Sequence, residues 1–196
     1  MITSSFVKGN NKQLVLKLQF DNDPEAFSEL YDRFAEPIYR FIYFKVGSRV
    51  DAQDLTSEVF LKAWAAIREK KEGVLNFRAF LYRIARNLVV DFYRAKRQNT
   101  SIEAIDPDAI MVSANIDRIA NNQELSVVLK AVRSLKDEYR ELIIFRFMDQ
   151  MSYKEIGQIL NKSQVTVRVT MHRAVKTLKR HLGATEEPKN SSPQQS

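Results

Sequence analysis

The sequence contains no cysteine, and only five glycines and five prolines among its 196 residues. The absence of cysteine excludes disulfides and thiolate metal sites, and it fits a reducing cytosol. The scarcity of glycine and proline disfavours turn-rich β architectures and permits long helices. Long apolar runs are also missing, because nothing approaches the roughly 18 apolar residues that a membrane span requires. We therefore expect a soluble cytoplasmic protein that is not inserted in a membrane.

Acidic residues are outnumbered, with 24 Asp and Glu against 31 Lys and Arg and a formal net charge of +7. Such a balance favours polyanionic partners such as nucleic acid. The charges are unevenly distributed: residues 99–117 contain four acids and no base, whereas residues 156–182 contain six Lys or Arg and no acid. The sequence also lacks a glycine-rich phosphate loop, a metal-spaced cluster and a nucleophile–base pair. We therefore expect no cofactor, no metal and no enzymatic activity.

Apolar residues recur at helical spacing over most of the chain, which predicts an all-α fold. The pattern from Pro24 to Gln98 predicts helices with breaks at Pro37, at Gly47-Ser48 and around Gly73. Between residues 99 and 117 the periodicity is lost, so this stretch reads either as an ordinary solvated connector or as a dedicated acidic linker. The expected organisation is an N-terminal segment, a first helical domain, a flexible acidic linker, a second helical domain and a disordered tail, at residues 1–23, 24–98, 99–120, 121–182 and 183–196.

The second domain contains the pattern of a helix-turn-helix. Ser152 with Glu155 forms a capping box that starts a short helix, and Ser163 is the expected N-cap of the next, cationic helix. The N-terminal part of such a second helix enters the major groove, and its Lys and Arg residues neutralise phosphates. Two exposed valines, Val165 and Val169, are explained by thymine methyl groups or equally by a protein partner. The alternative for the whole pattern is an amphipathic helix with a solvated basic face.

Two further surfaces are expected in the first domain. Arginines recur at helical spacing between residues 83 and 97 and are interleaved with aromatic residues, which suits single-stranded or melted DNA. A solvated basic face explains the arginines equally well. On the preceding predicted helix, Asp51, Asp54 and Glu58 line one side, which reads as a solvated acidic edge or as a docking surface for a basic partner.

Taken together, these stretches resemble bacterial sigma factors, the promoter-specificity subunits of RNA polymerase. "DAQDLTSEVFLKAW" followed by "FRAFLYRIARNLVVDFYRAKRQ" resembles their second conserved region. "LKDEYRELIIFRFMDQMSYKEIGQIL" with "TVRVTMHRAVKTLKRHL" resembles their fourth. The short length is similar to the extracytoplasmic-function (ECF) group of the sigma-seventy family. The resemblance covers residues 27–182, and the order of the regions matches.

The resemblance implies binding to core RNA polymerase, through its beta-prime clamp helices and its beta flap, to promoter DNA and to an anti-sigma factor. The residues implied in core binding are Asp51, Asp54, Leu55, Glu58 and Lys62. Those implied in minus-ten recognition and melting are Asn76, Tyr82, Arg83, Arg86, Asn87, Tyr93, Arg94 and Arg97. Those implied in minus-thirty-five recognition by the helix-turn-helix are Ser163, Gln164, Val165, Thr166, Arg168, Val169, His172, Arg173 and Lys176.

The resemblance also assigns roles to two connecting segments. Residues 70–76 correspond to the loop that captures a flipped base of the minus-ten element, and the acidic linker corresponds to the connector along the path of nascent RNA. The sequence departs from the family pattern in places. Thr56-Ser57 replaces a Val-Gln pair in the docking motif, Asn161-Lys162 replaces a Gly-Ile pair in the turn, and Thr170 replaces an arginine.

Three hypotheses follow from the sequence. The first is a sigma factor that binds core polymerase, directs it to promoters and aids DNA melting. The second is a free-standing DNA-binding regulator whose first domain is a sensor, although this leaves the arginine and aromatic pattern unexplained. The third, an enzyme, has no motif in its favour.

Overall fold

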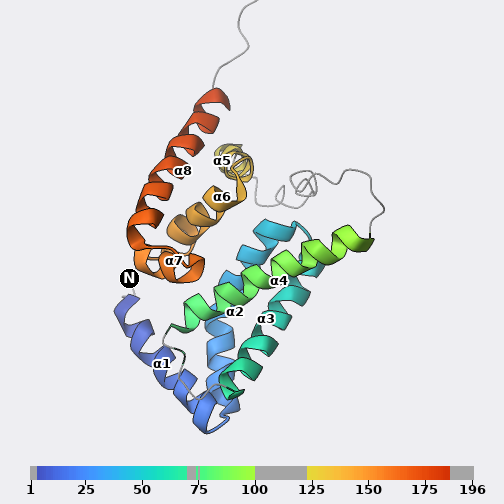
Figure 1. Ribbon diagram of the computed structural model, residues 1–196, viewed down its shortest axis with the longest axis vertical. Coiled ribbons are helices and arrows are strands. Elements are labelled where there is room, and N and C mark those ends of the chain that lie inside the picture. Colours follow the sequence, from blue (N-terminus) through green and yellow to red (C-terminus); the bar gives the residue numbers. More distant parts are fainter. Residues whose placement is uncertain (1–3, 70–73, 75, 100–122, 186–196) are drawn as a thin grey trace, which may run out of the picture. The chain divides into compact units, whose positions relative to one another are not determined.

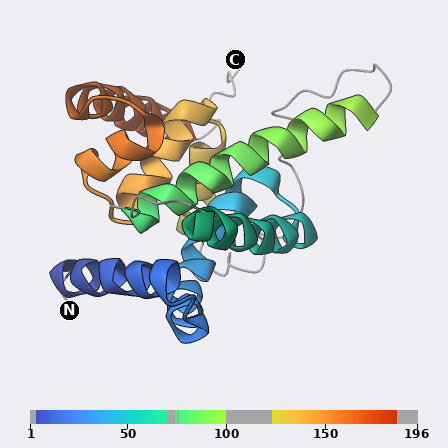
Figure 2. The ribbon, with the colours of Figure 1, turned by 60° about the horizontal axis from the view of Figure 1, so that its bottom comes forward.

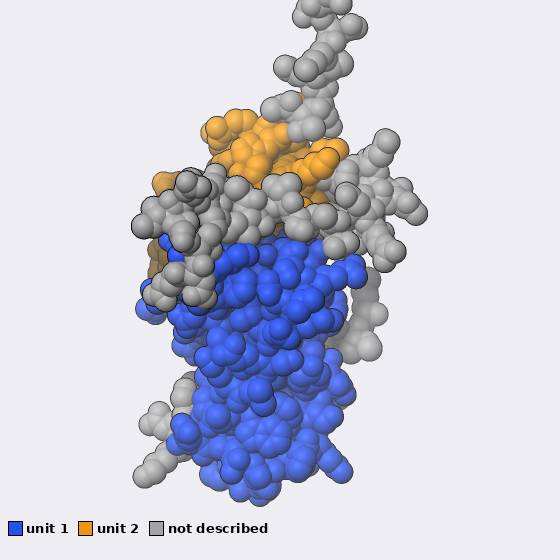
Figure 3. Space-filling model, turned by 90° about the vertical axis from the view of Figure 1, so that its right-hand side faces the viewer, with its two compact units in different colours: residues 1–113, 158–161 blue, residues 114–157, 162–196 orange. Residues whose placement is uncertain are grey.

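The computed structural model describes residues 4–69, 74, 76–99 and 123–185. Within these ranges every regular element is a helix, which confirms the predicted all-α fold. The chain divides into two compact units, residues 1–113 with 158–161 and residues 114–157 with 162–196 (Figure 3). The loop around Gly73, most of the predicted linker and most of the predicted tail lie outside the described residues.

The first unit contains four long helices (Figure 1). They are α1 (Ser4–Phe20), α2 (Pro24–Val46), α3 (Arg49–Glu69) and α4 (Phe77–Asn99). The helix α1 was not predicted from the sequence. It packs against α2, α3 and α4, and it buries Leu14, Val15 and Leu18. These three apolar residues span only about one and a half helical turns. So short a stripe does not distinguish a packed helix from a loop, which is why the sequence did not predict α1.

The helix α2 has a cap at each end. The Asp23 carboxylate accepts hydrogen bonds from the backbone N–H groups of Glu25 and Ala26, at 2.9 and 3.3 Å. At the other end Gly47 has a φ of 72°, a left-handed conformation that glycine adopts without a steric penalty. The prediction of a helix start at Pro37 is wrong, because α2 continues through it. Proline removes one backbone donor, and burial of the helix stripe on both sides of it outweighs that loss.

The helices α2, α3 and α4 lie side by side (Figure 2), and aromatic rings pair between α2 and α3 at a partly exposed edge of their core. The ring of Phe27 lies 4.2 Å from that of Trp64, and the ring of Tyr31 lies 4.6 Å from that of Phe60. Offset and tilted ring pairs of this kind stabilise a core beyond the area that they bury. The helices α3 and α4 are thus packed against the rest of the unit on one side and exposed on the other.

Residues 123–185 form four α-helices and a π-helical turn, which belong to the second unit except for residues 158–161. They are α5 (Gln123–Arg133), α6 (Asp137–Ile143), η3 (Ile144–Met148), α7 (Tyr153–Leu160) and α8 (Gln164–Thr185). The long helix α8 packs against α5 and α6. The buried Arg140 donates hydrogen bonds from one guanidinium nitrogen to the carbonyls of Arg133 and Leu135, at 2.7 and 2.8 Å. These bonds satisfy carbonyls at the end of α5 and fix the connection to α6.

Candidate nucleic-acid interface

The short helix α7 begins with the predicted capping box. The backbone N–H and the hydroxyl of Ser152 both donate to the Glu155 carboxylate, at 3.0 and 2.6 Å. In return the Glu155 backbone N–H donates to the Ser152 hydroxyl at 3.2 Å. The two residues satisfy each other's backbone donors, which confirms the prediction and fixes where α7 starts.

The turn between α7 and α8 depends on a close backbone approach at Gly157. The Lys162 N–H donates to the Gly157 carbonyl at 2.9 Å, and a Cβ on Gly157 would lie only 2.6 Å from the Lys162 carbonyl oxygen. Asn161 has a φ of 53°, a left-handed conformation that asparagine tolerates better than most residues. This geometry explains why asparagine can stand where the family pattern has glycine. Gly157 interrupts an otherwise helical sequence pattern, and this signal of a close approach was overlooked in the sequence.

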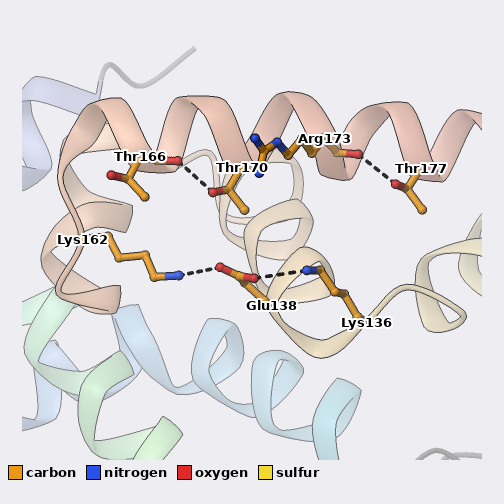
Figure 4. A network of polar contacts seen from close by, with 7 residues as sticks. All are labelled: Lys136, Glu138, Lys162, Thr166, Thr170, Arg173 and Thr177. Carbon is orange, nitrogen blue, oxygen red and sulfur yellow. Dashed lines mark hydrogen bonds and ion pairs between the residues drawn. The ribbon is translucent and has the colours of Figure 1, made fainter.

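The helix α8 begins at the predicted N-cap. The Thr166 backbone N–H donates to the Ser163 hydroxyl at 3.1 Å, and the Ser163 and Thr166 hydroxyls are 2.8 Å apart. Further along, Thr170 and Thr177 each donate a hydrogen bond to the carbonyl four residues earlier, at 2.9 and 3.0 Å (Figure 4). These hydroxyl groups are therefore engaged by α8 itself.

One side of α8 is buried and the other is exposed and cationic. Val167, Met171 and Ala174 are buried, as the sequence stripe predicted. The helix contains no Asp or Glu. The exposed residues include all of the remaining predicted contacts: Gln164, Val165, Arg168, Val169, His172, Arg173 and Lys176. This side of α8 is termed the α8 face, and its charge suits a polyanion.

Tyr153 lies within reach of two arginines. The guanidinium carbons of Arg146 and Arg168 lie 5.0 and 5.5 Å from the centre of its ring, within the range of cation–π attraction. Arg146 is held in place by a hydrogen bond to the Met151 carbonyl at 2.9 Å. Sequence reasoning missed this cluster, because contacts between the start of α7 and the start of α8 have no local periodic signal. The ring thus lies beside the exposed Arg168 side chain, near the start of α8.

An ion-pair network joins the turn to α6 (Figure 4). The Glu138 carboxylate lies 2.5 Å from the Lys162 ammonium and 3.5 Å from the Lys136 ammonium. The hydrogen bond from Lys162 is the main cause that lowers the pKa of Glu138 below its ordinary value of 4.5. The network thus holds Lys162, which stands where the turn of the family pattern has isoleucine.

The substitution Glu138→Gln is expected to lower the free energy of unfolding near neutral pH by less than about 1 kcal/mol, because the pair is partly exposed. The lowered folded-state pKa means that the pair stabilises the fold above pH 4.5 and that this contribution disappears as the pH falls through the folded-state pKa. Denaturant unfolding of the parent and of the variant, from pH 7 to pH 3, measures the difference in stability and its dependence on pH. If the difference in stability between the two proteins were as large at pH 3 as at pH 7, the ion pair of Glu138 would not be its cause.

The helix α4 exposes a second cationic surface. Arg83, Asn87, Arg94 and Arg97 are exposed, and Arg86 is half-buried. Asn76 accepts a hydrogen bond from the Ala79 N–H at 3.0 Å, so it also caps α4. These positions agree with the predicted basic stripe, and their contact with DNA remains a prediction.

The aromatic residues of this surface differ from the expectation. Tyr82 is fully buried with its ring edge-on to Phe41 at 5.3 Å, so it cannot stack on a base as predicted. It faces the core because it follows Leu81 on the broad apolar side of α4. Tyr93 is half-buried and donates its hydroxyl hydrogen to the Lys45 carbonyl at 2.6 Å. The ring of Tyr93 is thus held at the edge of the basic surface, between α4 and α2.

The exposed side of α3 combines acidic and apolar residues. Asp54 and Glu58 lie on it, and so do Val50 and Leu61, whose side chains are 66% and 69% exposed. Spacings of four, four and three residues place these four positions on one side of the helix, here termed the α3 face.

Other predicted core-binding residues have different positions. Leu55 is buried, so its predicted contact with a partner is corrected to a role in the core. Asp51 is half-buried, and Lys62 forms an ion pair with Glu58 at 3.0 Å. The exposed Leu61 was missed because the sequence reading considered only the acidic residues of this helix.

The part of the chain that the structure describes contains neither a candidate metal site nor a candidate membrane span. No group of three or more His, Cys, Asp or Glu side chains there could hold a metal ion. Among the same residues no helix is both long and apolar enough to cross a bilayer.

The fold and these surfaces define a helix-turn-helix protein with a second basic helical unit, and comparisons identify its family. The model of the family described as "Sigma-70 region 2" matches residues 30–99, and that described as "Sigma-70, region 4" matches residues 125–178. The two matches together cover more than half of the chain. The chain therefore belongs to the sigma-70 family, and several of its relatives are named ECF RNA polymerase sigma factors.

Among the relatives is the ECF RNA polymerase sigma factor BldN of Streptomyces coelicolor, which is 34% identical over 163 residues. That alignment covers 82% of this chain and 61% of BldN, so the chain spans less than two thirds of that relative. The ECF sigma factor SigW of Bacillus subtilis is 28% identical over 170 residues, which cover 82% of this chain and 90% of SigW. The solved structure of CnrH in complex with the cytosolic domain of CnrY has the same fold, with a TM-score of 0.68, 23% identity and coverage of 89% of this chain and 98% of CnrH.

Proposed function

We propose that this protein is a promoter-specificity subunit: it binds core RNA polymerase, directs it to particular promoters and aids opening of the duplex. The observation that carries this proposal is the presence of both sigma regions, in order, in one chain whose two units each expose a cationic helix face. A free-standing regulator needs only the helix-turn-helix. It gives no role to the exposed arginines of α4.

The first unit supplies two interfaces in this proposal. The α3 face docks on the beta-prime clamp helices, with Leu61 and Val50 as apolar anchors and Asp54 and Glu58 as acidic partners for basic residues. The arginines of α4 contact the minus-ten strand as it melts, where single-stranded backbone and exposed bases become available. Residues 70–76 would contact a flipped base, although most of this segment lies outside the described residues.

The second unit reads the upstream minus-thirty-five element. The start of α8 lies in the major groove, and Arg173 and Lys176 further along the helix contact phosphates. A contact with the beta flap positions this unit on the polymerase. The protein has no catalytic role of its own in this proposal, and it acts in the cytoplasm, where the polymerase and the chromosome are.

An anti-sigma factor is a further expected partner. CnrH was solved in complex with the cytosolic domain of CnrY, and a related sigma factor from Bartonella quintana was solved with the anti-sigma factor NepR. We infer that a comparable protein holds this chain inactive by covering the surfaces that bind the polymerase.

Copurification with core polymerase tests the proposal. The tagged full-length chain should retain the beta and beta-prime subunits, and the resulting holoenzyme should protect promoter DNA that the core enzyme alone does not. A chain that binds DNA but never retains core polymerase would favour the free-standing regulator.

The substitution Arg173→Ala is expected to weaken holoenzyme binding to duplex promoter DNA and to reduce the slope of log K against log salt by about 1, because one phosphate contact is lost. The measurement is a salt titration of the binding constant. Lys130→Ala on α5 is the matched control, since it removes one exposed positive charge from another helix of the same unit. Equal slopes for the Arg173 variant and the parent would remove Arg173 from the phosphate contacts.

A further inference from the structure

Two large apolar side chains lie on the otherwise cationic α8 face. Val165 and Val169 are 71% and 47% exposed. They are four residues apart, so they lie on the same side of the helix, about 6 Å apart along its axis. Both are in the first two turns, the part of a recognition helix that enters the groove. Exposed valines carry no advantage for a solvated helix surface, because valine is a weaker helix former than arginine, lysine, glutamine or glutamate.

The hydroxyl groups beside the valines are directed at the protein. Thr166 is engaged by the Ser163 cap, and Thr170 donates to the Thr166 carbonyl at 2.9 Å (Figure 4). The hydroxyl group of Thr170, which is partly exposed, is thus engaged by the helix itself.

Charge decides which partner fits this surface. The exposed cations Arg168 and Arg173 flank the valines, and α8 has no Asp or Glu to pair with them. A polyanion complements such a face better than a protein surface of mixed charge. Within the major groove the only apolar group that a base pair presents is the C5-methyl of thymine.

We propose that Val165 and Val169 are specificity-determining residues that contact two thymine methyl groups in the upstream promoter element. The valines are about 6 Å apart along α8, and successive bases of one strand are about 3.4 Å apart along the duplex. The two thymines therefore lie one or two base steps apart. This inference rests on the proposed function, and it adds the kind of base pair that the helix selects.

Deoxyuridine substitution tests the inference, because it removes the thymine methyl group and leaves the base pairing unchanged. Holoenzyme made from core polymerase and the full-length chain first selects preferred fragments from promoter DNA with a randomised upstream region. Each thymine of the selected element is then replaced singly by deoxyuridine, and holoenzyme binding is measured. Binding should fall about fourfold at each of two positions, the effect of one buried methyl group, and remain unchanged at the other thymines.

The valine variants identify which residue contacts which methyl group. Val165→Ala should abolish the sensitivity to deoxyuridine at one position, and Val169→Ala should abolish it at the other. Val128→Ala is the matched control, because Val128 is an exposed valine of α5, outside the helix-turn-helix. This variant should keep both sensitivities.

Other results would overturn the inference. If deoxyuridine has no effect in an element that the holoenzyme does select, the valines contact no thymine, while the proposed function still stands. If the valine variants lose affinity for core polymerase and keep their sensitivity to deoxyuridine, the valines bind protein instead. A holoenzyme that selects no upstream sequence at all would contradict the proposed function and this inference together.

Discussion

The substitution Gly157→Ala should lower the free energy of unfolding of the second unit by about 2 kcal/mol, within the range measured for overpacked sites. Alanine is normally favoured over glycine inside a helix by about 1 kcal/mol, so intrinsic propensity predicts the opposite sign. The reason is steric: the new Cβ would lie 2.6 Å from the Lys162 carbonyl oxygen, and this neighbour is backbone that cannot rotate away. The turn between α7 and α8 must open, and holoenzyme binding to the upstream element should weaken with it.

Gly183→Ala is the matched control for this prediction. Gly183 also lies in a helix of the second unit, and a Cβ there would meet nothing within 4 Å. This variant should be as stable as the parent or more stable, by up to about 1 kcal/mol. Denaturant unfolding of the full-length chain measures both variants. If the two alanine variants were equally stable, the close approach at Gly157 would not be what shapes the turn.

The substitution Leu61→Glu should weaken binding to core polymerase at least 30-fold, the effect of losing an interface residue worth about 2 kcal/mol. Leu61 is an exposed apolar side chain beside Glu58 on the α3 face, so a further carboxylate there would be buried unpaired against the partner. The fold should be unaffected, because the side chain is 69% exposed in the free chain.

Phe20→Glu is the control for the α3 face. Phe20 is 73% exposed at the end of α1, so this variant makes the same kind of apolar-to-acidic change on another helix. Affinity for core polymerase, measured by fluorescence anisotropy of the labelled chain, should fall for the Leu61 variant alone. Unaltered affinity of that variant would remove the α3 face from the docking interface.

Local signals in the sequence were sufficient to predict much of the fold and the start of the site. The capping box of Ser152 and Glu155 involves residues three apart, and the N-cap at Ser163 acts within one helical turn. The buried stripe of α8 follows from helical periodicity alone. Such features depend on neighbours along the chain, so a sequence contains all the information they need.

Features that depend on tertiary packing could not be predicted in the same way. Pro37 would start a helix in an isolated peptide, but burial along α2 keeps one helix continuous through it. Tyr82 was assigned to DNA because it flanks arginines, and the structure buries it against Phe41. The contact between Tyr153 and Arg168 joins two helices, and neither residue reveals it alone. Each case needs the position of a second helix.

Promoter-dependent transcription with purified core polymerase tests the central claim most directly. Template DNA from a selected promoter is incubated with core enzyme, with and without the full-length chain, and both duplex opening and transcript length are measured. We expect an opened region and a transcript of defined start only when the chain is present. Equal opening and equal transcripts without the chain would contradict the claim that this protein gives the polymerase its promoter specificity.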